Sequence, residues 1–482
     1  MNTRYFGQSE KELEEAARII RSGGLAAFPT ETVYGLGGNA LDPEAARKIY
    51  AAKGRPSDNP LIVHISDVSQ LEPLVLEFPE NARKLAEAIW PGPMTMVLRK
   101  KPIVPDATTG GLDTVAIRFP ADETAQKLIS LASVPIAAPS ANLSGRPSPT
   151  RWEDVREDLD GRADAIIMGE PCIGGIESTV VDMTGELPMI LRPGLITPER
   201  ISSVLGLPCG YDPAILSEPA EGLVPKAPGM KYKHYAPKAE MTLYSGPAGA
   251  VRRRIEEDAK GLRESGKDVA VLRYGSSRMA AEKLFADLRE LDREGKDVIL
   301  AETLDDRESV AFSVMNRMLR SAGYHVIEVK DMKIALASDH GGFELKEAVK
   351  AHLIERGYEV LDLGTDSTQS VDYPIYGEKC GRAVASGEAD RGVICCGTGI
   401  GISIAANKIK GIRAAVVTNE YMAEYCKLHN DANIISFGGR VISKEDAIRF
   451  TDIWLDTEFE GGRHQRRVDM LNSLGADPAS HS

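Results

Sequence analysis

A restart of the sequence pattern near Met332 limits the folds that this chain can adopt. From residue 333 onward, short apolar runs alternate with segments of helical period, from the pair 333–337 and 342–356 to the pair 433–436 and 443–456. Such regular alternation predicts a parallel, doubly wound α/β sheet with its sites at the carboxyl ends of the strands. We therefore expect this part to be a domain of its own, as if Met332 had once begun a separate protein.

The residues before Met332 predict two further domains and a linker, within the two to four domains expected for 482 residues. Ser9 and Glu12 form a capping box that opens a helix, and a mixed strand and helix pattern follows. A stretch rich in Pro, Gly and Ala is typical of a linker, and short strand and helix units follow it. The predicted class is α/β throughout: a twisted sheet in 1–205, a linker in 206–240, a small Rossmann-like domain in 241–331 and the doubly wound domain in 332–482.

Composition excludes several classes of protein. No apolar run approaches the roughly 20 residues of a membrane span, and the first residues lack the apolar segment of a secretory signal. Six cysteines without a C-x-x-C pair argue against a disulfide scaffold or a zinc site. A net charge of −13 argues against holding nucleic acid by bulk electrostatics. We therefore expect a cytoplasmic protein that binds no membrane.

Residues 28–37 and 53–64 form the first candidate binding region. A strand ends at the start of this region, and its glycines would let the backbone approach a ligand closely. Lys53 and Arg55 are two cations beside this turn, which suits a polyphosphate. The small polar residues of 138–142 could bind a ligand or cap the next helix. An ordinary surface loop is the alternative for the whole region.

Five separated motifs in this part of the chain share one order with a known family. They are Phe28-Pro-Thr-Glu-Thr-Val-Tyr-Gly-Leu-Gly37, Lys53-Gly-Arg55, Asn59-Pro-Leu-Ile-Val-His64, Trp90-Pro-Gly-Pro93 and Pro139-Ser-Ala-Asn142. Together they resemble the YrdC-like threonylcarbamoyl-AMP synthases over roughly residues 8–205. The linker motif at 228–237, which contains the run Tyr232-Lys-His-Tyr235, looks like the long, two-domain form of that family.

The resemblance implies a nucleotidyltransferase that converts L-threonine, bicarbonate and ATP to threonylcarbamoyl-AMP and pyrophosphate. A separate transferase complex would then pass the threonylcarbamoyl group to a tRNA adenosine. We expect Mg²⁺ to accompany the triphosphate, although the sequence offers no carboxylate cage for it. By the resemblance, ATP and the carbamate would contact Lys53, Arg55, Asn59, Thr114, Ser140, Asn142, Ser148, Arg192 and Tyr235, and threonine would contact Thr32, His64, Arg118 and Ser178.

Two further expectations concern this first region. Tyr235 would reach back from the linker to cover the site and exclude water. The alternative is an RNA-binding module that uses the same basic surface, and the lack of an aromatic-rich basic stripe counts against it.

A second constellation of motifs lies after residue 332. It comprises Ser338-Asp-His-Gly-Gly342, Asp372-Tyr-Pro374, Cys395-Cys-Gly-Thr-Gly-Ile-Gly401, Asn407-Lys408, Leu428-His-Asn-Asp431, Gly438-Gly-Arg440 and Gly461-Gly-Arg-His-Gln-Arg-Arg467. The Gly-rich motif is not a dinucleotide fingerprint, because Ile402 stands where the third glycine should be. The set resembles the B-type ribose-5-phosphate isomerases over roughly residues 332–475. The resemblance implies an aldose–ketose isomerase that needs no cofactor and acts on ribose 5-phosphate, with galactose 6-phosphate or allose 6-phosphate as alternatives known in that family.

The position of two adjacent cysteines predicts the catalytic base. Side chains alternate along the strand 392–396, so Cys395 and Cys396 should point to opposite faces. Only Cys396 joins the Gly-rich turn, whose amides and the Thr398 hydroxyl could hold an enediolate oxygen. Cys395 should be an inert apolar filler. His429 is the candidate for opening the furanose ring, with an ordinary helix-terminal histidine as the alternative.

The remaining sugar-phosphate contacts follow from the resemblance. They are Asp339, His340, Gly397, Gly399, Ile400, Gly401, Asn430, Arg440, Arg463 and Arg467. Arg463 and Arg467 lie four residues apart, so on a helix they can grip one phosphate. The family offers them to a neighbouring subunit, which predicts a homodimer or a higher oligomer, and Arg466 has no assigned role. The expected protein is thus one chain with two enzymes, and no residue indicates channelling between them.

Overall fold

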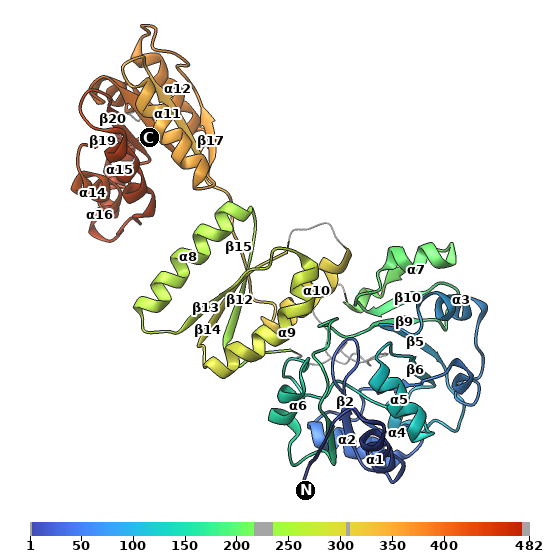
Figure 1. Cartoon of the computed structure of the whole chain (residues 1–482). Helices are drawn as coiled ribbons and strands as arrows, with labels where there is room; N and C mark the ends of the chain where they lie inside the picture. Colours follow the sequence, from blue (N-terminus) through green and yellow to red (C-terminus); the bar gives the residue numbers. More distant parts are fainter. Residues whose placement is uncertain (1, 216–234, 305–308, 475–482) are drawn as a thin grey trace, which may run out of the picture. The chain divides into compact units, whose positions relative to one another are not determined.

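The computed structural model describes residues 2–215, 235–304 and 309–474. The chain folds into two compact units, Met1–Ser245 with Ile255–Ile327 and Gly246–Arg254 with Glu328–Ser482. The sheets contain 11, 4 and 5 strands, and helices pack on each of them (Figure 1). The predicted α/β class is therefore confirmed. None of the described helices is long and apolar enough to cross a membrane.

The first sheet has mixed strand directions, as the sequence predicts. Its strands follow the order β1-β8-β2-β3-β7-β4-β6-β5-β9-β10-β11. Their bounds are β1 Arg4–Phe6, β2 Ala26–Phe28, β3 Gly35–Asn39, β4 Ile62–His64, β5 Met94–Arg99, β6 Thr114–Arg118, β7 Ile136–Ala137, β8 Ala165–Ile167, β9 Thr179–Asp182, β10 Met189–Arg192 and β11 Gly210–Tyr211. The helices around it are α1 Glu10–Arg21, α2 Pro43–Lys53, α3 Glu80–Ile89, α4 Asp106–Thr109, α5 Glu123–Ala132, α6 Trp152–Leu159 and α7 Pro198–Leu205, with 3₁₀ turns at Val68–Leu71 and Pro213–Ile215.

The predicted capping box begins α1. The backbone amide of Glu12 donates to Ser9 Oγ at 3.4 Å, and Glu12 Oε1 accepts from the amide of Gly7 at 2.8 Å. The cap therefore satisfies one of the first backbone donors of the helix, the amide of Glu12. Its apolar face, which includes Leu13 and Ile20, is buried against α5.

Residues 35–39 form a strand, which corrects the predicted Gly-rich turn. β3 pairs antiparallel with β2 and with β7. A Cβ on Gly37 would lie 2.7 Å from side-chain atoms of both Phe28 and Ile136. A Cβ on Gly38 would likewise lie 3.0 Å from the Leu25 side chain. Core packing therefore requires glycine at both positions. Of Gly35, Gly37 and Gly38, only Gly35 lines the cavity described below.

The small second sheet follows the predicted strand and helix units closely. Its order is β13-β14-β12-β15, and β12 and β13 both pair parallel with β14. The bounds are β12 Glu240–Ser245, α8 Ala248–Glu264, β13 Val269–Leu272, α9 Ser277–Glu294, β14 Val298–Glu302, α10 Ser309–Ser321 and β15 Val326–Glu328. Helices α9 and α10 bury apolar side chains with this sheet, in a cluster that also holds Tyr235.

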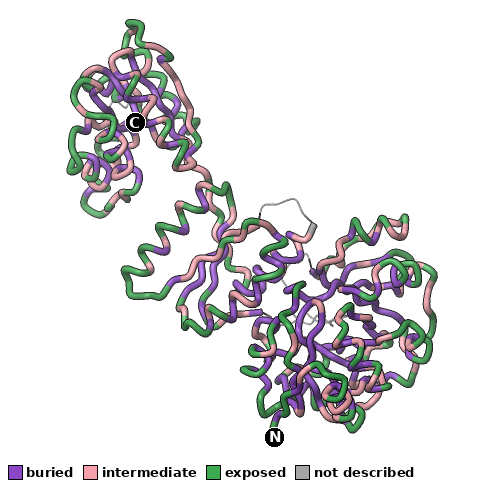
Figure 2. The backbone as a smooth tube through the Cα atoms, in the orientation of Figure 1, coloured by how far each residue is buried: buried purple, intermediate pink, exposed green. Residues whose placement is uncertain are grey.

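The third sheet is entirely parallel, which confirms the doubly wound prediction. Its order is β17-β16-β18-β20-β19. The bounds are β16 Lys333–Ser338, α11 Phe343–Glu355, β17 Glu359–Asp362, α12 Tyr373–Ala385, β18 Arg391–Cys396, α13 Ile400–Ala406, β19 Ala414–Val416, α14 Glu420–Leu428, β20 Ile434–Gly438, α15 Lys444–Asp456 and α16 Arg463–Ser473. Helices α11, α14 and α15 share one buried cluster and α12 and α13 the other. Figure 2 shows burial concentrated along the strands.

Candidate active sites

A cavity in the first unit gathers eight of the predicted ligand contacts. The parallel neighbours β4 and β6 end together, with His64 in register with Arg118. Lys53 is the last residue of α2, and Arg192 is the last residue of β10. The predicted residues that line the cavity are Lys53, Arg55, His64, Arg118, Ser140, Asn142, Arg192 and Tyr235.

Lys53 ties α2 to the loop that follows β7. Its Nζ donates to the carbonyl oxygens of Ser140 and Asn142, and lies 3.4 Å from Asn142 Oδ1. Ser140 Oγ also donates to Asn142 Oδ1, at 2.6 Å. Burial holds the pKa of Lys53 well below its usual range. Lys53 is therefore a buried group that shapes the loop, which rules out the alternative of an ordinary surface lysine.

Arg55 has one donor that no described residue uses. Its guanidinium donates to the carbonyl oxygens of Asn59, at 3.3 Å, and Pro60, at 3.1 Å. Its Nε is buried without a hydrogen-bond partner among the described residues. Burial lowers the pKa of Arg55 to about 10, so the side chain stays charged at neutral pH. The geometry leaves a cationic donor for an anionic oxygen.

Arg118 forms an ion pair on one side and keeps a free donor on the other. Its NH2 lies 2.8 Å from Glu31 Oε1. Its Nε is buried without a partner among the described residues. The Oγ1 atoms of Thr30 and Thr32 lie 2.9 Å apart, and Thr30 Oγ1 also lies 3.4 Å from Arg118 NH2. Small polar groups and one guanidinium thus converge here.

His64 is a neutral group in this cavity. Its Nδ1 lies 3.1 Å from the carbonyl oxygen of Ile62, and its ring meets that of Phe28 edge to face. Burial, followed by the charge of Arg118, lowers the pKa of His64 to about 3. A neutral imidazole can accept or donate one hydrogen bond without adding charge.

Glu177 is a cavity residue that the sequence analysis missed. Its Oε1 accepts from Ser148 Oγ at 2.6 Å. Burial alone would raise the pKa of Glu177, but the charges of Arg317 and Arg192 lower it. Arg192 in turn donates to the Oγ of Ser178 at 3.0 Å. The signal was present in the run Glu177-Ser-Thr, where only the serine had been assigned.

Tyr235 is one of the residues that line the cavity. It is buried, its ring stacks on Phe285 with centroids 5.0 Å apart, and the amide of Ala236 donates to Gly145 O at 2.9 Å. The other members of its motif, Tyr232, Lys233 and His234, lie outside the described residues.

Five predicted contacts do not line the cavity. Ser148, Ser178 and Thr32 are buried behind lining residues, through the hydrogen bonds given above. Asn59 is buried, and its Oδ1 has no partner among the described residues. Thr114 begins β6, whereas Arg118 ends it, so the length of the strand separates Thr114 from the cavity.

A second group of predicted residues lies at the carboxyl edge of the third sheet. Cys396 ends β18, and the amide of Gly399 donates to its Sγ at 3.1 Å. Cys395 packs with the cluster on the other face of the sheet, and burial raises the pKa of its thiol above the usual range. The predicted alternation of the two thiols is confirmed. The Oγ1 of Thr398 accepts from the amide of Ile400 at 3.3 Å.

Neighbouring strands bring more of the predicted residues to this edge. Asp339 follows β16, and its Oδ1 accepts from the amides of Gly341, at 2.8 Å, and Gly342, at 3.0 Å. His340 Nδ1 accepts from a backbone amide at 3.2 Å. The amide of Arg440, just after β20, donates to the carbonyl oxygen of Gly397 at 3.1 Å.

The other predicted sugar-phosphate residues lie at the opposite edge. Arg413 precedes β19, and its guanidinium donates to the carbonyl oxygens of Asn430 and Asp431, which follow α14. Because Arg413 lies at the start of β19, the carboxyl end of α14 must lie at the amino edge of the sheet. His429 lies there, with its ring stacked on His464 at 4.0 Å between centroids.

Arg463 lies with His429 at the amino edge, since its Nε is 3.1 Å from His464 Nε2. Helix α16 also carries the exposed Arg466 and Arg467. Glu460 completes the cluster at 3.4 Å from His429, and it was not predicted. The fold therefore does not bring His429 to Cys396 of the same chain.

Three family models match successive parts of the chain. They are described as "Telomere recombination", over residues 18–194, "Threonylcarbamoyl-AMP synthase, C-terminal domain", over residues 196–323, and "Ribose/Galactose Isomerase", over residues 334–471. The threonylcarbamoyl-AMP synthase of Pyrococcus abyssi is 49% identical over 332 residues, covering 66% of this chain and 96% of that protein. The ribose-5-phosphate isomerase B of Escherichia coli is 51% identical over 142 residues, covering 30% of this chain and 95% of that protein. The chain belongs to both of these enzyme families.

One polypeptide thus joins a member of the threonylcarbamoyl-AMP synthase family to a member of the ribose-5-phosphate isomerase B family. We call residues 18–323 the synthase part and residues 334–471 the isomerase part. A solved structure of P. abyssi Sua5 in complex with L-threonine is 47% identical, with a TM-score of 0.65, and covers 68% of this chain and all of that one. The resemblance found in the sequence motifs is confirmed for both parts.

Proposed function

We propose that the cavity of the synthase part binds threonine, bicarbonate and ATP together. The observation that carries this proposal is the pair of buried guanidinium donors, Arg55 Nε and Arg118 Nε, that no described residue satisfies. A buried donor without a partner is costly, so each is well placed to receive a ligand oxygen. Both arginines line the same cavity, and two guanidinium groups suit two anions.

The first step joins threonine to bicarbonate. The threonine amine attacks the bicarbonate carbon, and water leaves as the carbamate forms. We assign Arg118 to the threonine carboxylate, with the neutral His64 and the hydroxyls of Thr32 and Ser178 beside it. Because His64 adds no charge, the single guanidinium decides the orientation of the amino acid.

The second step transfers the adenylyl group. A carbamate oxygen attacks the α-phosphorus of ATP, and pyrophosphate leaves. Both reacting groups are anionic, so Lys53, Arg55 and Arg192 would screen their repulsion, and the remaining predicted contacts would fix the nucleotide. Tyr235 would keep water from the labile product.

Mg²⁺ would come with the nucleotide. Glu177, the carboxylate that lines the cavity, already pairs with Arg317 at 3.1 Å. We therefore assign no protein ligand to the ion, and triphosphate oxygens and water would hold it, as Mg²⁺ prefers. When bound, it would offset part of the triphosphate charge.

In the isomerase part, we propose Cys396 as the base. Its thiolate would take the proton from C2 of open-chain ribose 5-phosphate and return it to C1. A second proton passes from the C2 hydroxyl to the C1 oxygen, which gives ribulose 5-phosphate. The Gly399 amide, which donates to Sγ at 3.1 Å, supports this role because it fixes the sulfur beside the Gly-rich turn. Thr398 and the amides of 397–401 would stabilise the enediolate oxygen.

A complete isomerase site would need two copies of the chain. His429 and Arg463 lie at the sheet edge opposite Cys396, so one subunit cannot supply both groups. We place each site between the Cys396 edge of one copy and the His429 edge of another. Ring opening by His429 and phosphate binding by Arg463 and Arg467 would then come from the second copy.

Two assays on the intact chain test these proposals. Pyrophosphate release that requires both threonine and bicarbonate is the expected synthase result, and nucleotide-independent RNA binding alone would favour the RNA-binding alternative. Ribose 5-phosphate should be isomerised faster than allose 6-phosphate or galactose 6-phosphate. A faster rate on either hexose phosphate would reverse the substrate assignment. Transfer of the product to a tRNA complex and a cytoplasmic location stay predictions from the sequence.

A further inference from the structure

One face of helix α9 contacts two segments that carry lining residues of the synthase cavity. Phe285, Arg289 and Asp292 follow the spacing i, i+4, i+7, so their side chains lie on one face of the helix. Phe285 stacks on Tyr235 at 5.0 Å. Asp292 Oδ1 accepts from the amide of Lys238 at 2.7 Å, three residues after Tyr235. The small domain thus holds the segment that carries the tyrosine.

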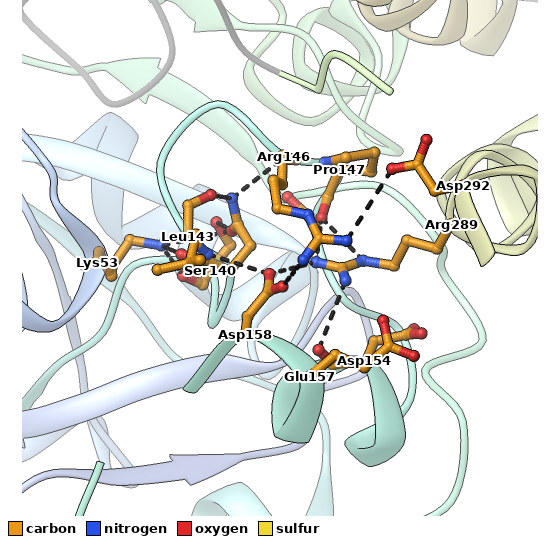
Figure 3. Close-up of polar contacts among 12 residues, drawn as sticks. Lys53, Ser140, Leu143, Arg146, Pro147, Asp154, Glu157, Asp158, Arg289 and Asp292 are labelled. Atoms are coloured by element: carbon orange, nitrogen blue, oxygen red, sulfur yellow. Dashed lines mark hydrogen bonds and ion pairs between the residues drawn. The ribbon is translucent and has the colours of Figure 1, made fainter. Parts of the chain in front are cut away.

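Arg289 holds the loop that carries the predicted ATP contacts. Its Nε and NH2 both donate to the carbonyl oxygen of Pro147, at 3.1 and 2.7 Å (Figure 3). Its NH2 also lies 2.7 Å from Asp158 Oδ2, and neither side chain has any exposed surface. The planar guanidinium fork fits this double task, which a lysine ammonium does not reproduce.

Asp158 passes this support on to Asn142. Its Oδ2 accepts from the amide of Leu143 at 3.1 Å, and its Oδ1 pairs with Arg146. Asn142 Nδ2 donates to the carbonyl oxygens of Leu143 and Arg146, at 2.8 and 2.9 Å. Lys53 Nζ bonds to the same asparagine. A continuous buried network therefore joins α9 to Lys53.

A second arginine of the small domain supports the loop at Ser148, the residue next to Pro147. Arg317 of α10 is buried, and its Nε and NH2 donate to Glu177 Oε2 at 3.2 and 3.1 Å. Glu177 Oε1 in turn accepts from Ser148 at 2.6 Å. Guanidinium groups from outside the first sheet thus support the carboxyl end of the 140–148 loop, directly at Pro147 and through Glu177 at Ser148. Asp158 carries the support of Arg289 on to Leu143, nearer the other end.

We propose that the small domain completes the nucleotide side of the synthase site, with Arg289 and Arg317 as positioning residues for the 140–148 loop. This rests on the site residues proposed above. Removal of Arg289 frees the Pro147 carbonyl and leaves Asp158 without its buried partner, so Asn142 and Lys53 lose their fixed places. The threonine side, around Arg118 and His64, has no described contact with Arg289.

Arg293 is the matched control. It lies one turn further along α9, is 32% exposed, and pairs with Asp154 at 2.8 Å and Glu157 at 3.1 Å on α6. It therefore joins the same two domains without a described contact to the 140–148 loop. Its loss tests whether any interdomain ion pair has the same effect.

The experiment measures synthase kinetics and threonine binding for the full-length chain and three variants, Arg289→Ala, Arg289→Lys and Arg293→Ala. We expect Arg289→Ala to raise KM for ATP and to lower kcat/KM for ATP by at least tenfold, while the Kd for threonine changes less than threefold. Arg289→Lys should recover only part of the loss, and Arg293→Ala should stay within twofold of the parent chain. Mere partial unfolding would lower kcat and the fraction of chains that bind threonine together, without moving KM.

Several results would overturn the proposal. They are an unchanged kcat/KM for ATP in Arg289→Ala, an equal loss in Arg293→Ala, and parallel loss of ATP and threonine binding. If Arg289→Ala does not fold, Arg289→Lys decides, because the lysine keeps the buried charge beside Asp158, and parental kinetics would then refute the positioning role. An inactive parent chain would instead refute the proposed function itself.

Discussion

The backbone amide of Gly399 donates a hydrogen bond of 3.1 Å to the Sγ of Cys396. Gly399 has a φ of 77°, a conformation that glycine adopts without strain. A Cβ at this position would lie 2.9 Å from the carbonyl carbon of Phe437. The same glycine therefore allows the tight turn and aims a donor at the proposed base.

Replacement of each cysteine should separate the base from its neighbour. We expect Cys396→Ala to remove isomerisation of ribose 5-phosphate and Cys395→Ala to keep most of it. Cys395 fills the core on the other face, so its loss should cost on the order of 1 kcal/mol of stability and little rate. A coupled assay of ribulose 5-phosphate formation checks this. An active Cys396→Ala protein would make Asp339 the next base to test.

Mixing two inactive variants should restore isomerase activity. If each site lies between two copies, a heterodimer of Cys396→Ala and His429→Ala contains one site with both groups intact. Random exchange of subunits would then recover about a quarter of the parent activity. Light scattering should show a dimer or a higher oligomer. An active monomer, or a mixture that stays inactive after proven subunit exchange, would contradict the shared site.

His429 should act on the cyclic sugar rather than on proton transfer. We expect His429→Ala to lose more rate on ribose 5-phosphate, which must open its ring, than on the open-chain ribulose 5-phosphate in the reverse direction. Initial rates in both directions, at matched saturation, give the ratio of the forward to the reverse loss of rate. Equal losses in the two directions would argue against ring opening.

Tyr235 should act by covering the synthase cavity. Loss of its stack on Phe285, worth about 1 kcal/mol, should weaken ATP binding roughly fivefold in Tyr235→Ala. Tyr235→Phe keeps the stack and serves as the control. Titration calorimetry measures ATP binding, and limited proteolysis follows the linker. Unchanged kinetics, with a linker still cleaved in the presence of ATP and threonine, would refute a covering role.

His64 should make the synthase part less stable in acid. Its pKa in the folded protein is about 3, below the value near 6.5 of an exposed histidine. Between these values the unfolded chain binds the extra proton, so stability falls as pH drops from about 6.5, by at most about 1.4 kcal/mol per pH unit. His64→Gln should flatten this dependence. Calorimetry of the threonine-stabilised transition between pH 4.5 and 7 measures it, and identical pH slopes would contradict the prediction.

The sequence predicted those parts of the fold whose local pattern and tertiary environment agree. The helix that starts at Ser9 and the alternating units after Met332 are examples, because capping and periodicity act over a few residues. Residues 35–39 were misjudged because their glycines indicate a turn locally. Their role in β3 depends on Phe28 and on Ile136, about a hundred residues away.

The sequence motifs predicted the residues that line the cavity better than the residues that hold the lining in place. Lys53, Arg55 and Arg118 lie in recognisable motifs, whereas Arg289 and Arg317 lie on ordinary amphipathic helices. Only the tertiary structure shows that these two arginines are fully buried against carboxylates of the first sheet's domain. The sequence also did not predict that His429 and Cys396 lie at opposite edges of the third sheet. This follows from the direction in which α14 runs along the sheet.

The most direct test of the fusion is to measure both activities on one set of full-length proteins: the parent chain, Arg55→Ala and Cys396→Ala. Arg55 is preferred to Lys53, whose buried ammonium also holds the 140–142 loop, so that Lys53→Ala would combine lost activity with altered folding. We predict that Arg55→Ala abolishes threonylcarbamoyl-AMP formation and leaves ribose 5-phosphate isomerisation within twofold, and that Cys396→Ala does the reverse. A single substitution that removes both activities, or a parent chain that lacks either one, would contradict two independent active sites in this polypeptide.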